Sequence, residues 1–217
     1  MEMSMPALII ASYLLGSIPF GLLIAKAHGK DLRSIGSGNI GATNVSRALG
    51  KKWAYVCFLL DVSKGFVPTF IASFMIGASP KPIDLIMWLA VGCAAVAGHI
   101  FPVYIRFKGG KGVATSLGIG LGLWPYYTLS AVSAFAVWGI CVLITRYVSL
   151  SSIIGSFAFL AVLLTSVAIV DSWQFANLWP LIAVGIFMPM LITYRHRDNI
   201  KRLMAGTENK IFSNRAK

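Results

Sequence analysis

Long apolar runs separated by short polar segments make up most of the chain. Six of these runs are long enough to cross a bilayer as helices, which takes about 20 residues at ~1.5 Å each. We expect these spans at roughly 5–25, 54–78, 84–105, 126–145, 151–170 and 175–194. A seventh run, from Val113 to Leu123, would form a helix only about 16 Å long. The pattern predicts an all-α integral membrane protein whose topology depends on this short run.

The positions of the basic residues favour a crossing by the short run. Cytoplasmic loops of membrane proteins carry an excess of Lys and Arg. Of the 19 lysines and arginines, all except Lys64 and Lys81 lie in four places: 26–52, 106–111, Arg146, and from position 195 onward. If the short run crosses, the four groups share one side, whereas without it Arg146 lies opposite the first two groups. We therefore predict one domain over 1–217 with seven transmembrane helices, the N-terminus outside and the C-terminus in the cytoplasm. The glycines of the short run predict close packing inside the bundle.

Composition agrees with a membrane protein and argues against a nucleic-acid partner. The chain is 57% hydrophobic and only 12% charged, about half the charged fraction of soluble domains. Its formal charge of +12 lies between and after apolar runs instead of on one polar face, so anionic lipids or substrates explain it better than nucleic acid. Cys57, Cys93 and Cys141 each lie inside an apolar run without C-x-x-C or Cys/His spacing, so we expect buried thiols and no metal site.

Four polar segments carry the candidate chemistry, and all of them are predicted to lie on the cytoplasmic side. Gly, Ser, Thr, Asn, Lys and Arg dominate these segments, whereas carboxylates are scarce. Such a composition favours anion binding through backbone N–H groups exposed by glycine, hydroxyl and amide donors, and fixed positive charge. The segments are 30–52, 98–116, 146–152 and 194–210.

The segment "GSGNIGATN", residues 36–44, contains the G-x-G-x-x-G string of dinucleotide-binding folds. That fold needs a strand before the glycines, a helix after them and an acid about 20 residues further on. Asp61 lies at that distance from Gly41, but it falls inside an apolar span instead of after a second strand. We therefore reject a nicotinamide or flavin site.

The segment "FKGGKGVATS" has the character of a phosphate loop without the P-loop pattern. That pattern would require Gly at Ile105 and Ser or Thr at Gly112. A glycine-rich turn bearing Lys108 and Lys111 nevertheless leads into a helix at Val113, which suits a phosphate group. The alternative is a flexible, solvated loop.

Several charged or titratable residues lie in or next to apolar runs. Asp61 and Lys64 are three residues apart on one helical face, which predicts either an ion pair bracing the polar loops or a catalytic role. His99 is either a buried histidine bonded to backbone or a group that orients a loop or binds substrate. His196 and Asn199 share a helix face just after the last span.

Together these segments resemble a known family. "GSGNIGATNVSRALGKK", "GHIFPVYIRFKGGKGVAT", "RYVSLSSI" and "HRDNIKRLMAGTE" are similar to the cytoplasmic motifs and tail of the bacterial acyl-phosphate-dependent glycerol-3-phosphate acyltransferases. The resemblance implies acyl transfer from acyl phosphate to the 1-hydroxyl of glycerol 3-phosphate, giving lysophosphatidic acid and phosphate. It implies no cofactor and an active site on the cytoplasmic face of the bacterial inner membrane. We expect a monomer surrounded by membrane lipids, with a soluble acyl-phosphate-forming enzyme as a plausible partner.

The histidines agree with acyl phosphate as the donor. Many acyltransferases that use acyl-CoA or acyl-carrier protein contain an H-x-x-x-x-D pair that activates the acceptor hydroxyl. None of His28, His99 and His196 has Asp five positions on. A mixed anhydride has a good leaving group, so positioning and charge neutralisation can supply much of the catalysis. The donor's own phosphate can serve as the base, as the resemblance implies.

On this resemblance we expect two sets of site residues. The catalytic set contains Ser37, Lys111, Ser149, Ser152, His196 and Asn199. The set expected to bind substrate or phosphate contains Gly36, Gly38, Asn39, Gly41, Thr43, Asn44, Arg47, His99, Lys108, Gly109, Gly110 and Gly112. A covalent acyl intermediate on Ser37 is an alternative, although the sequence shows no His/Asp partner that would activate the serine.

A transporter or lipid scramblase is the rival class. It too could combine seven spans with phosphate-binding loops. Secondary transporters usually show internal repeats and polar sites at the membrane midplane. Here no repeat is evident and the polar residues gather at one face, which favours an enzyme acting at the membrane surface.

Overall fold

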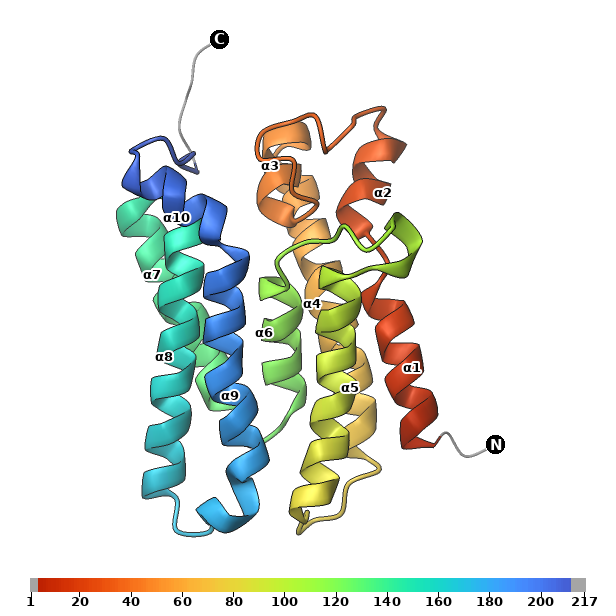
Figure 1. Ribbon diagram of the computed structural model, residues 1–217, viewed down its shortest axis with the longest axis vertical. Helices are drawn as coiled ribbons and strands as arrows, with labels where there is room; N and C mark the ends of the chain where they lie inside the picture. The colour runs from red at the N-terminus through yellow and green to blue at the C-terminus, as the bar shows by residue number, and fades with distance from the viewer. Residues whose placement is uncertain (1–3, 212–217) are drawn as a thin grey trace. The chain divides into compact units, whose positions relative to one another are not determined.

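The computed structural model describes residues 4–211, and these residues form helices and loops without a strand (Figure 1). The chain divides into two compact units, Met1–Thr128 and Leu129–Lys217, called unit 1 and unit 2 below. Unit 1 contains α1 (Met5–Gly16), α2 (Phe20–Ala27), α3 (Ala42–Leu49), α4 (Lys51–Ser73), α5 (Pro82–Ile100), the 3₁₀ helix η1 (Val103–Ile105) and α6 (Val113–Gly122). The chain continues through α7 (Thr128–Thr145), α8 (Val148–Ile169), α9 (Phe175–Arg195) and α10 (Arg197–Met204).

The six long spans expected from the apolar runs are confirmed as helices. Each is long and apolar enough to cross a membrane: Met5–Ala27, Lys51–Ser73, Pro82–Ile105, Thr128–Thr145, Val148–Ile169 and Phe175–Arg195. The short seventh run forms α6, a helix of 10 residues, or about 15 Å at the helical rise. None of the residues of α6 is exposed, in keeping with the expected packing inside the bundle.

The first span is broken, which the apolar pattern did not predict. α1 ends at Gly16 and α2 begins at Phe20. Pro19 lacks an N–H and disfavours helical geometry at Ile18, which favours a break at this point, whereas α4 and α9 continue through their own prolines. The break leaves the carbonyl group of Ile18 outside a regular helix, where it accepts a hydrogen bond from Lys64 at 3.2 Å.

Unit 1 is held together by close helix contacts at glycines. α1 packs against α5, where a Cβ on Gly98 would lie 2.3 Å from the carbonyl oxygen of Tyr13. α4 packs against α6, where a Cβ on Gly118 would lie 2.0 Å from the carbonyl oxygen of Val62. Small residues let helix backbones approach in lipid, where apolar burial alone does not drive association.

Unit 2 is a bundle in which α8 packs against α9, and α10 contacts both. α7 approaches α8 at Gly155, where an added Cβ would meet the carbonyl oxygen of Ala134 at 3.1 Å. α7 carries a row of exposed apolar side chains suited to lipid contact: Leu129, Val132, Phe135, Ile140, Leu143 and Ile144.

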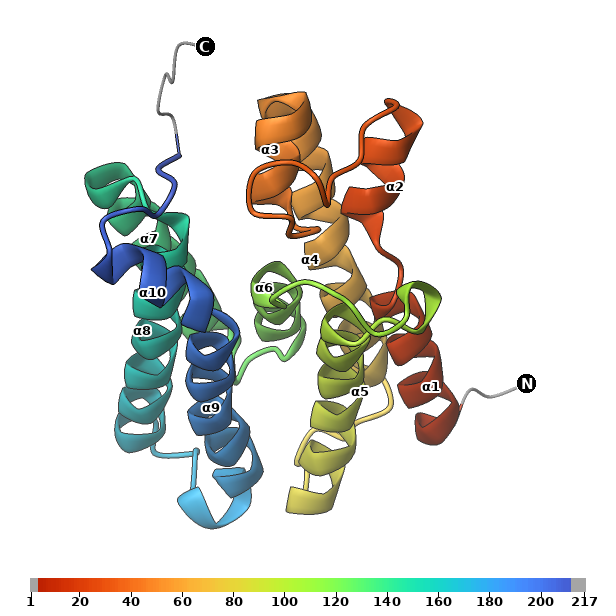
Figure 2. The ribbon, with the colours of Figure 1, turned by 45° about the horizontal axis from the view of Figure 1, so that its top comes forward.

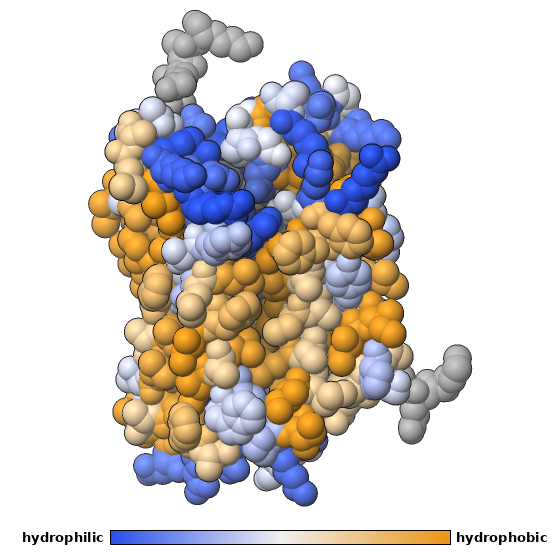
Figure 3. All heavy atoms as spheres, viewed as in Figure 1, coloured by the Kyte–Doolittle hydropathy of each residue, from blue (hydrophilic) through white to orange (hydrophobic). Residues whose placement is uncertain are grey.

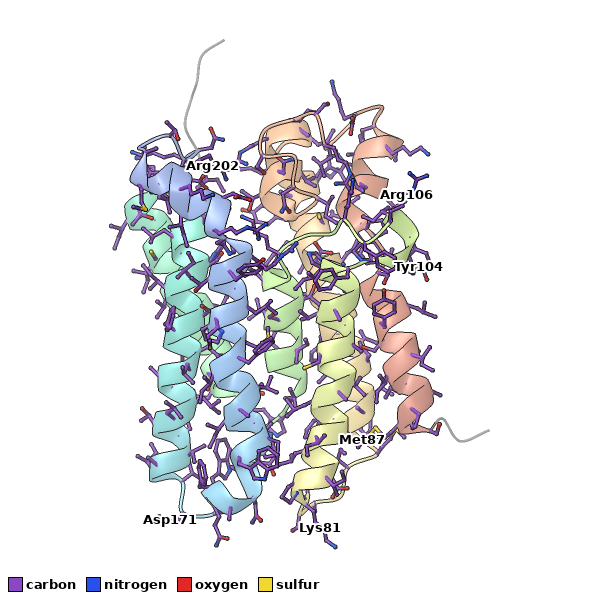
Figure 4. The ribbon with its side chains drawn as sticks, in the orientation of Figure 1. Lys81, Met87, Tyr104, Arg106, Asp171 and Arg202 are labelled. Carbon is purple, nitrogen blue, oxygen red and sulfur yellow. The ribbon has the colours of Figure 1, made fainter. Side chains whose placement is uncertain are left out.

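Each unit has one strongly polar end. In unit 1 the hydrophilic residues gather around α2 and α3, and in unit 2 around α10, while the long helices are mostly covered by hydrophobic residues (Figure 3). Lys81 and Arg106 mark opposite ends of α5, and Asp171 and Arg202 mark opposite ends of unit 2 (Figure 4). The ends around Arg106 and Arg202 carry the segments in which the sequence placed the candidate chemistry.

Candidate functional site

The loop between α2 and α3, residues 28–41 and called the first polar loop, is folded around the side chain of Asn44. Its amide nitrogen donates hydrogen bonds to the carbonyl oxygens of Leu32 and Ile35, both at 2.9 Å. Its amide oxygen accepts a hydrogen bond from the backbone N–H of Ser37 at 3.1 Å. Asn44 is only 1% exposed. The structure therefore places Asn44 beneath the loop, where it sets the loop's shape.

Glycine is required at the tip of the first polar loop. Gly36 and Gly38 have φ values of 58° and 67°, a region that favours glycine. A Cβ on Gly36 would lie 2.5 Å from the amide oxygen of Asn44. The carboxamide oxygen of Asn39 accepts a hydrogen bond from the N–H of Gly41 at 3.0 Å, which closes the turn before α3. Ser37 is exposed at this tip.

The second loop, residues 108–112 and called the glycine-rich loop, lies directly on the end of α5. Gly109 and Gly110 donate their N–H groups to the carbonyl oxygens of Ile100 and His99, at 3.2 and 3.0 Å. A Cβ on Gly109 would lie 2.1 Å from the carbonyl oxygen of His99. Lys108 is exposed and Lys111 is half-buried. The glycines thus allow the loop to lie against backbone while its lysines stay at the polar end.

The two loops meet within unit 1. Arg33 of the first polar loop donates a hydrogen bond from Nη2 to the carbonyl oxygen of Lys108 at 2.8 Å. Figure 2 shows both loops at the end of unit 1 that carries α2 and α3.

The first polar loop leads into α3 and the glycine-rich loop into α6, and neither helix has a side-chain cap at its N-terminus. Uncapped N–H groups and the positive end of the helix dipole both favour an anion. Together with Lys108, Lys111 and Arg47, they make this end of unit 1 suited to binding phosphate.

A buried charged cluster lies at the end of α5, under the glycine-rich loop. Lys64 Nζ lies 2.8 Å from Asp61 Oδ1, and His99 Nδ1 lies 3.7 Å from the same oxygen. Asp61, Lys64 and His99 are 3%, 2% and 5% exposed. The sequence placed Asp61 and Lys64 on one face of a helix, and the structure adds His99 as the neighbour from α5.

In unit 2 the predicted residues gather around a carboxylate that the sequence analysis did not single out. Glu208 accepts hydrogen bonds from Ser149 Oγ at 2.8 Å and from the amide nitrogen of Asn199. Its other oxygen pairs with Nε of Arg202 at 2.7 Å. Glu208 lies just past a glycine in the polar tail, and nothing in the residues around it indicated a role. The scarcity of carboxylates among so many donors was the signal that could have identified it.

The remaining predicted residues of unit 2 are bonded to their own helices. Ser152 Oγ donates to the carbonyl oxygen of Val148 at 2.8 Å. His196 Nδ1 lies 2.8 Å from the carbonyl oxygen of Ile192, and His196 is 2% exposed. When Nδ1 donates this hydrogen bond, Nε2 of the neutral ring is an acceptor.

Glu208 is held in its charged form. Burial alone raises its pKa, but the hydrogen bonds from Asn199, Ser149 and Arg202 and the charge of Arg202 outweigh burial, so the pKa lies below its ordinary value. A carboxylate with a lowered pKa stabilises the fold above its ordinary pKa, about 4.3, and loses that contribution as the pH falls through the lowered value.

We predict that Glu208→Gln destabilises the protein by about 1–3 kcal/mol at pH 7, because it removes charge-assisted hydrogen bonds. The difference from the wild type narrows as the pH falls below the ordinary glutamate pKa, about 4.3, because the unfolded chain then takes up a proton before the folded protein does. Thermal unfolding in detergent between pH 3 and 7 measures both effects. Asp171→Asn, which alters an exposed carboxylate of the same unit, serves as the control. A difference between wild type and Glu208→Gln that stays constant over this range contradicts the prediction.

No metal centre is evident in the part of the chain that the structure describes. Within residues 4–211, no three side chains of His, Cys, Asp or Glu come together in a way that could hold an ion.

Comparison with known proteins identifies similar sequences and structures over nearly the whole chain. The sequence profile described as "Glycerol-3-phosphate acyltransferase" matches residues 6–206. A protein of that name from Aquifex aeolicus (strain VF5) is 47% identical over 206 residues, which cover 94% of this chain and 97% of the relative. A relative of the same name from Bradyrhizobium diazoefficiens is 42% identical over 97% of each chain.

Two solved structures are similar to the chain. The crystal structure of PlsY (YgiH), an integral membrane glycerol 3-phosphate acyltransferase, in its glycerol 3-phosphate form matches with a TM-score of 0.83 and 42% identity over 95% of each chain. The lysophosphatidic acid form of PlsY matches with a TM-score of 0.80 and 41% identity, again over 95% of each chain.

Proposed function

Since the chain belongs to the glycerol-3-phosphate acyltransferase family, we propose that it takes its acyl group from acyl phosphate. The protein is a multi-pass membrane enzyme that acylates glycerol 3-phosphate to lysophosphatidic acid. With acyl phosphate as the donor, both substrates carry a phosphate group, and the second product is inorganic phosphate.

The meeting of the two polar loops of unit 1 is the observation that carries this proposal. The contact between Arg33 and the carbonyl group of Lys108 joins two loops that each lead into an uncapped helix N-terminus. Arg47 in the last turn of α3, whose side chain approaches Gly36, and Lys111 just before α6 add positive charge. Such a surface neutralises phosphate and favours a reaction in which phosphate is both the anchor and the leaving group.

The reaction then requires little covalent chemistry from the protein. The 1-hydroxyl oxygen of glycerol 3-phosphate attacks the carbonyl carbon of acyl phosphate and forms the ester bond. The bond between that carbonyl carbon and the bridging phosphate oxygen breaks. The hydroxyl proton passes to the departing phosphate, so no protein group has to act as the base.

We assign the residues of unit 1 by where they lie. Ser37, Gly38, Asn39 and Thr43 contact the phosphates and glycerol hydroxyls, and Asn44 holds the first polar loop in the shape that presents them. Arg47, Lys108 and Lys111 neutralise phosphate charge, and Gly36, Gly41, Gly109, Gly110 and Gly112 allow backbone approach. In unit 2, Ser149 and Asn199 act through Glu208 to shape that unit's polar end, where His196 and Ser152 also lie.

The donor is tested with purified enzyme in detergent. Radiolabelled glycerol 3-phosphate is mixed with acyl phosphate, acyl-CoA or acyl-carrier protein carrying the same chain. We expect lysophosphatidic acid from acyl phosphate alone, with one inorganic phosphate released per product. Equal product from acyl-CoA contradicts the proposed donor. Trapping an acylated Ser37 with donor alone overturns direct transfer.

We further propose seven transmembrane helices with the N-terminus outside, as the distribution of basic residues indicates. The polar ends then face the cytoplasm, and the enzyme lies as a monomer in the bacterial inner membrane, where a soluble enzyme can supply acyl phosphate. This topology predicts that Lys81→Cys and Asp171→Cys react with an impermeant maleimide outside intact cells, whereas Arg106→Cys does not. Without a crossing by α6, Lys81 and Asp171 would lie on opposite sides of the membrane.

The labelling experiment needs a background without reactive native thiols. The expectation of buried thiols was wrong for two of the three cysteines, since Cys93 is exposed and Cys141 is partly exposed, and only Cys57 is buried. All three are replaced by alanine. Arg202→Cys is the matched cytoplasmic position in unit 2, and it should label only after the membrane is permeabilised. Labelling of Lys81→Cys without Asp171→Cys in intact cells refutes the seven-span topology.

A further inference from the structure

We propose that Asp61 and Lys64 are positioning residues for substrate binding: they hold His99, and the ring of His99 sets the position of the glycine-rich loop. The inference rests on the proposed phosphate role of that loop. Asp61 and Lys64 are both buried, so they would act on substrate binding through His99 and not by direct contact.

Asp61 is anchored by Lys64 of the same helix, and Lys64 is in turn held at the break between α1 and α2. Asp61 Oδ1 pairs with Lys64 Nζ at 2.8 Å. Lys64 Nζ also donates to the carbonyl oxygen of Ile18 at 3.2 Å and lies 5.7 Å from the ring centroid of Phe20. The break between α1 and α2 thus supplies a carbonyl group and an aromatic face for the buried ammonium. These contacts fix the position of the Asp61 carboxylate.

The carboxylate of Asp61 in turn lies next to the ring of His99. His99 Nδ1 lies 3.7 Å from Asp61 Oδ1 and has no hydrogen-bond partner among the described residues. The carboxylate is therefore the polar group that orients the ring, because an N–H at Nδ1 is attracted to its negative charge. α4 thereby controls the orientation of a side chain on α5.

The ring of His99 lies directly against the glycine-rich loop. A Cβ on Gly110 would lie 2.2 Å from His99 Nε2, and 3.0 and 3.1 Å from the neighbouring ring atoms Cε1 and Cδ2. The imidazole edge therefore fills the space that a side chain at Gly110 would occupy. The backbone of His99 also accepts the N–H of Gly110 at 3.0 Å. A rotation of the ring moves the loop, and with it Lys111 and the N-terminus of α6.

A different result is expected if the Asp61–Lys64 ion pair only stabilises the fold. Replacing a buried ion pair by apolar residues of similar size is often neutral or stabilising, so stability alone does not need Asp61 and Lys64. If the pair serves only to hold the helices together, a stable apolar replacement leaves substrate binding intact. If it positions His99, binding weakens even when the fold is as stable as before.

The test uses the double variant Asp61→Leu/Lys64→Met. We expect a melting temperature close to that of the wild type and a KM about tenfold higher for at least one substrate, with kcat changed much less. Glycerol 3-phosphate and acyl phosphate are varied in separate arms to identify whose phosphate the loop binds. Thr69→Val, a buried change on α4 away from the cluster, is the matched control and should leave both KM values unchanged.

His99→Asn keeps an N–H donor toward Asp61 and removes the imidazole edge beneath Gly110. We expect the same rise in KM as in Asp61→Leu/Lys64→Met. Adding that double substitution to His99→Asn should change KM by less than about twofold further, because all these substitutions act through the ring of His99. Wild-type KM values in a folded double variant overturn the proposal, as do wild-type values in His99→Asn. If the double variant does not fold, His99→Asn alone decides.

Calorimetric binding of glycerol 3-phosphate separates this inference from the proposed donor. The measurement needs no acyl phosphate, so it compares wild type and variants even if the donor proves wrong. A wild-type enzyme that is inactive with acyl phosphate contradicts the proposed donor. Unchanged affinity for glycerol 3-phosphate together with an unchanged KM for the donor contradicts the positioning role.

Discussion

Gly109→Ala should lower kcat/KM at least about 100-fold, the loss expected when reacting groups are misplaced by about 1 Å. The added Cβ would lie 2.1 Å from the carbonyl oxygen of His99 and 2.6 Å from that of Ile100. Both are backbone atoms at the end of a long helix, so the glycine-rich loop has to move instead. That movement breaks the hydrogen bond from Gly109 to Ile100 and displaces Lys111. Steady-state kinetics with both substrates measures the loss.

Gly139→Ala is the matched control for this substitution. Nothing lies within 4 Å of a Cβ at Gly139, and alanine favours a helix more than glycine does. We expect full activity and an equal or higher melting temperature. If Gly109→Ala retains activity near that of Gly139→Ala, the glycine-rich loop tolerates displacement and its assignment as the phosphate site is wrong.

Lys111→Ala should lower kcat/KM by about 10²–10³, the usual cost of removing one preorganised group that neutralises charge in a transition state. Lys111 lies between Gly110 and the N-terminus of α6, where its ammonium adds to the positive end of the helix dipole. Lys111→Arg keeps the charge with a different donor geometry, so we expect an intermediate loss.

Lys30→Ala is the control for the general effect of lost positive charge. Lys30 is exposed in the first polar loop and is assigned no role at the site. We expect it to retain near-wild-type activity in the same assay. Lys111→Ala activity as high as that of Lys30→Ala would remove Lys111 from the phosphate site.

The spans and polar segments could be predicted from the sequence because each depends on local composition. Twenty apolar residues in a row have few alternatives to a membrane helix, so all six long spans were predicted within a few residues. Pro19 interrupts the first of these helices without changing its hydropathy, so the break was not visible in the apolar pattern. The interruption depends on backbone geometry, which a search for apolar runs does not test.

Contacts between distant residues account for what the sequence left open. The spacing of Asp61 and Lys64 predicts that they can pair, since both lie on one helix face. The approach of His99 to Asp61 depends on how α5 packs against α4, which no local pattern specifies. Glu208 was missed for the same reason, because Ser149 is 59 residues away in the chain. Asn44 was predicted as a ligand contact, but its amide is engaged with three backbone groups of the first polar loop.

The buried charges of α4 also constrain how the chain enters the membrane during synthesis. The apolar window of α4 has a mean hydropathy of 1.4, against 1.8 to 2.3 for the other five spans. An Asp or Lys near the centre of a helix each costs about 2.5–3.5 kcal/mol on insertion. Of the six long spans, α4 is therefore the least favourable to insert by itself. The carbonyl group of Ile18 is already available when α4 emerges, but His99 follows 38 residues after Asp61. We therefore expect the insertion of α4 to become more favourable once α5 has been made, so that the two helices enter the membrane together.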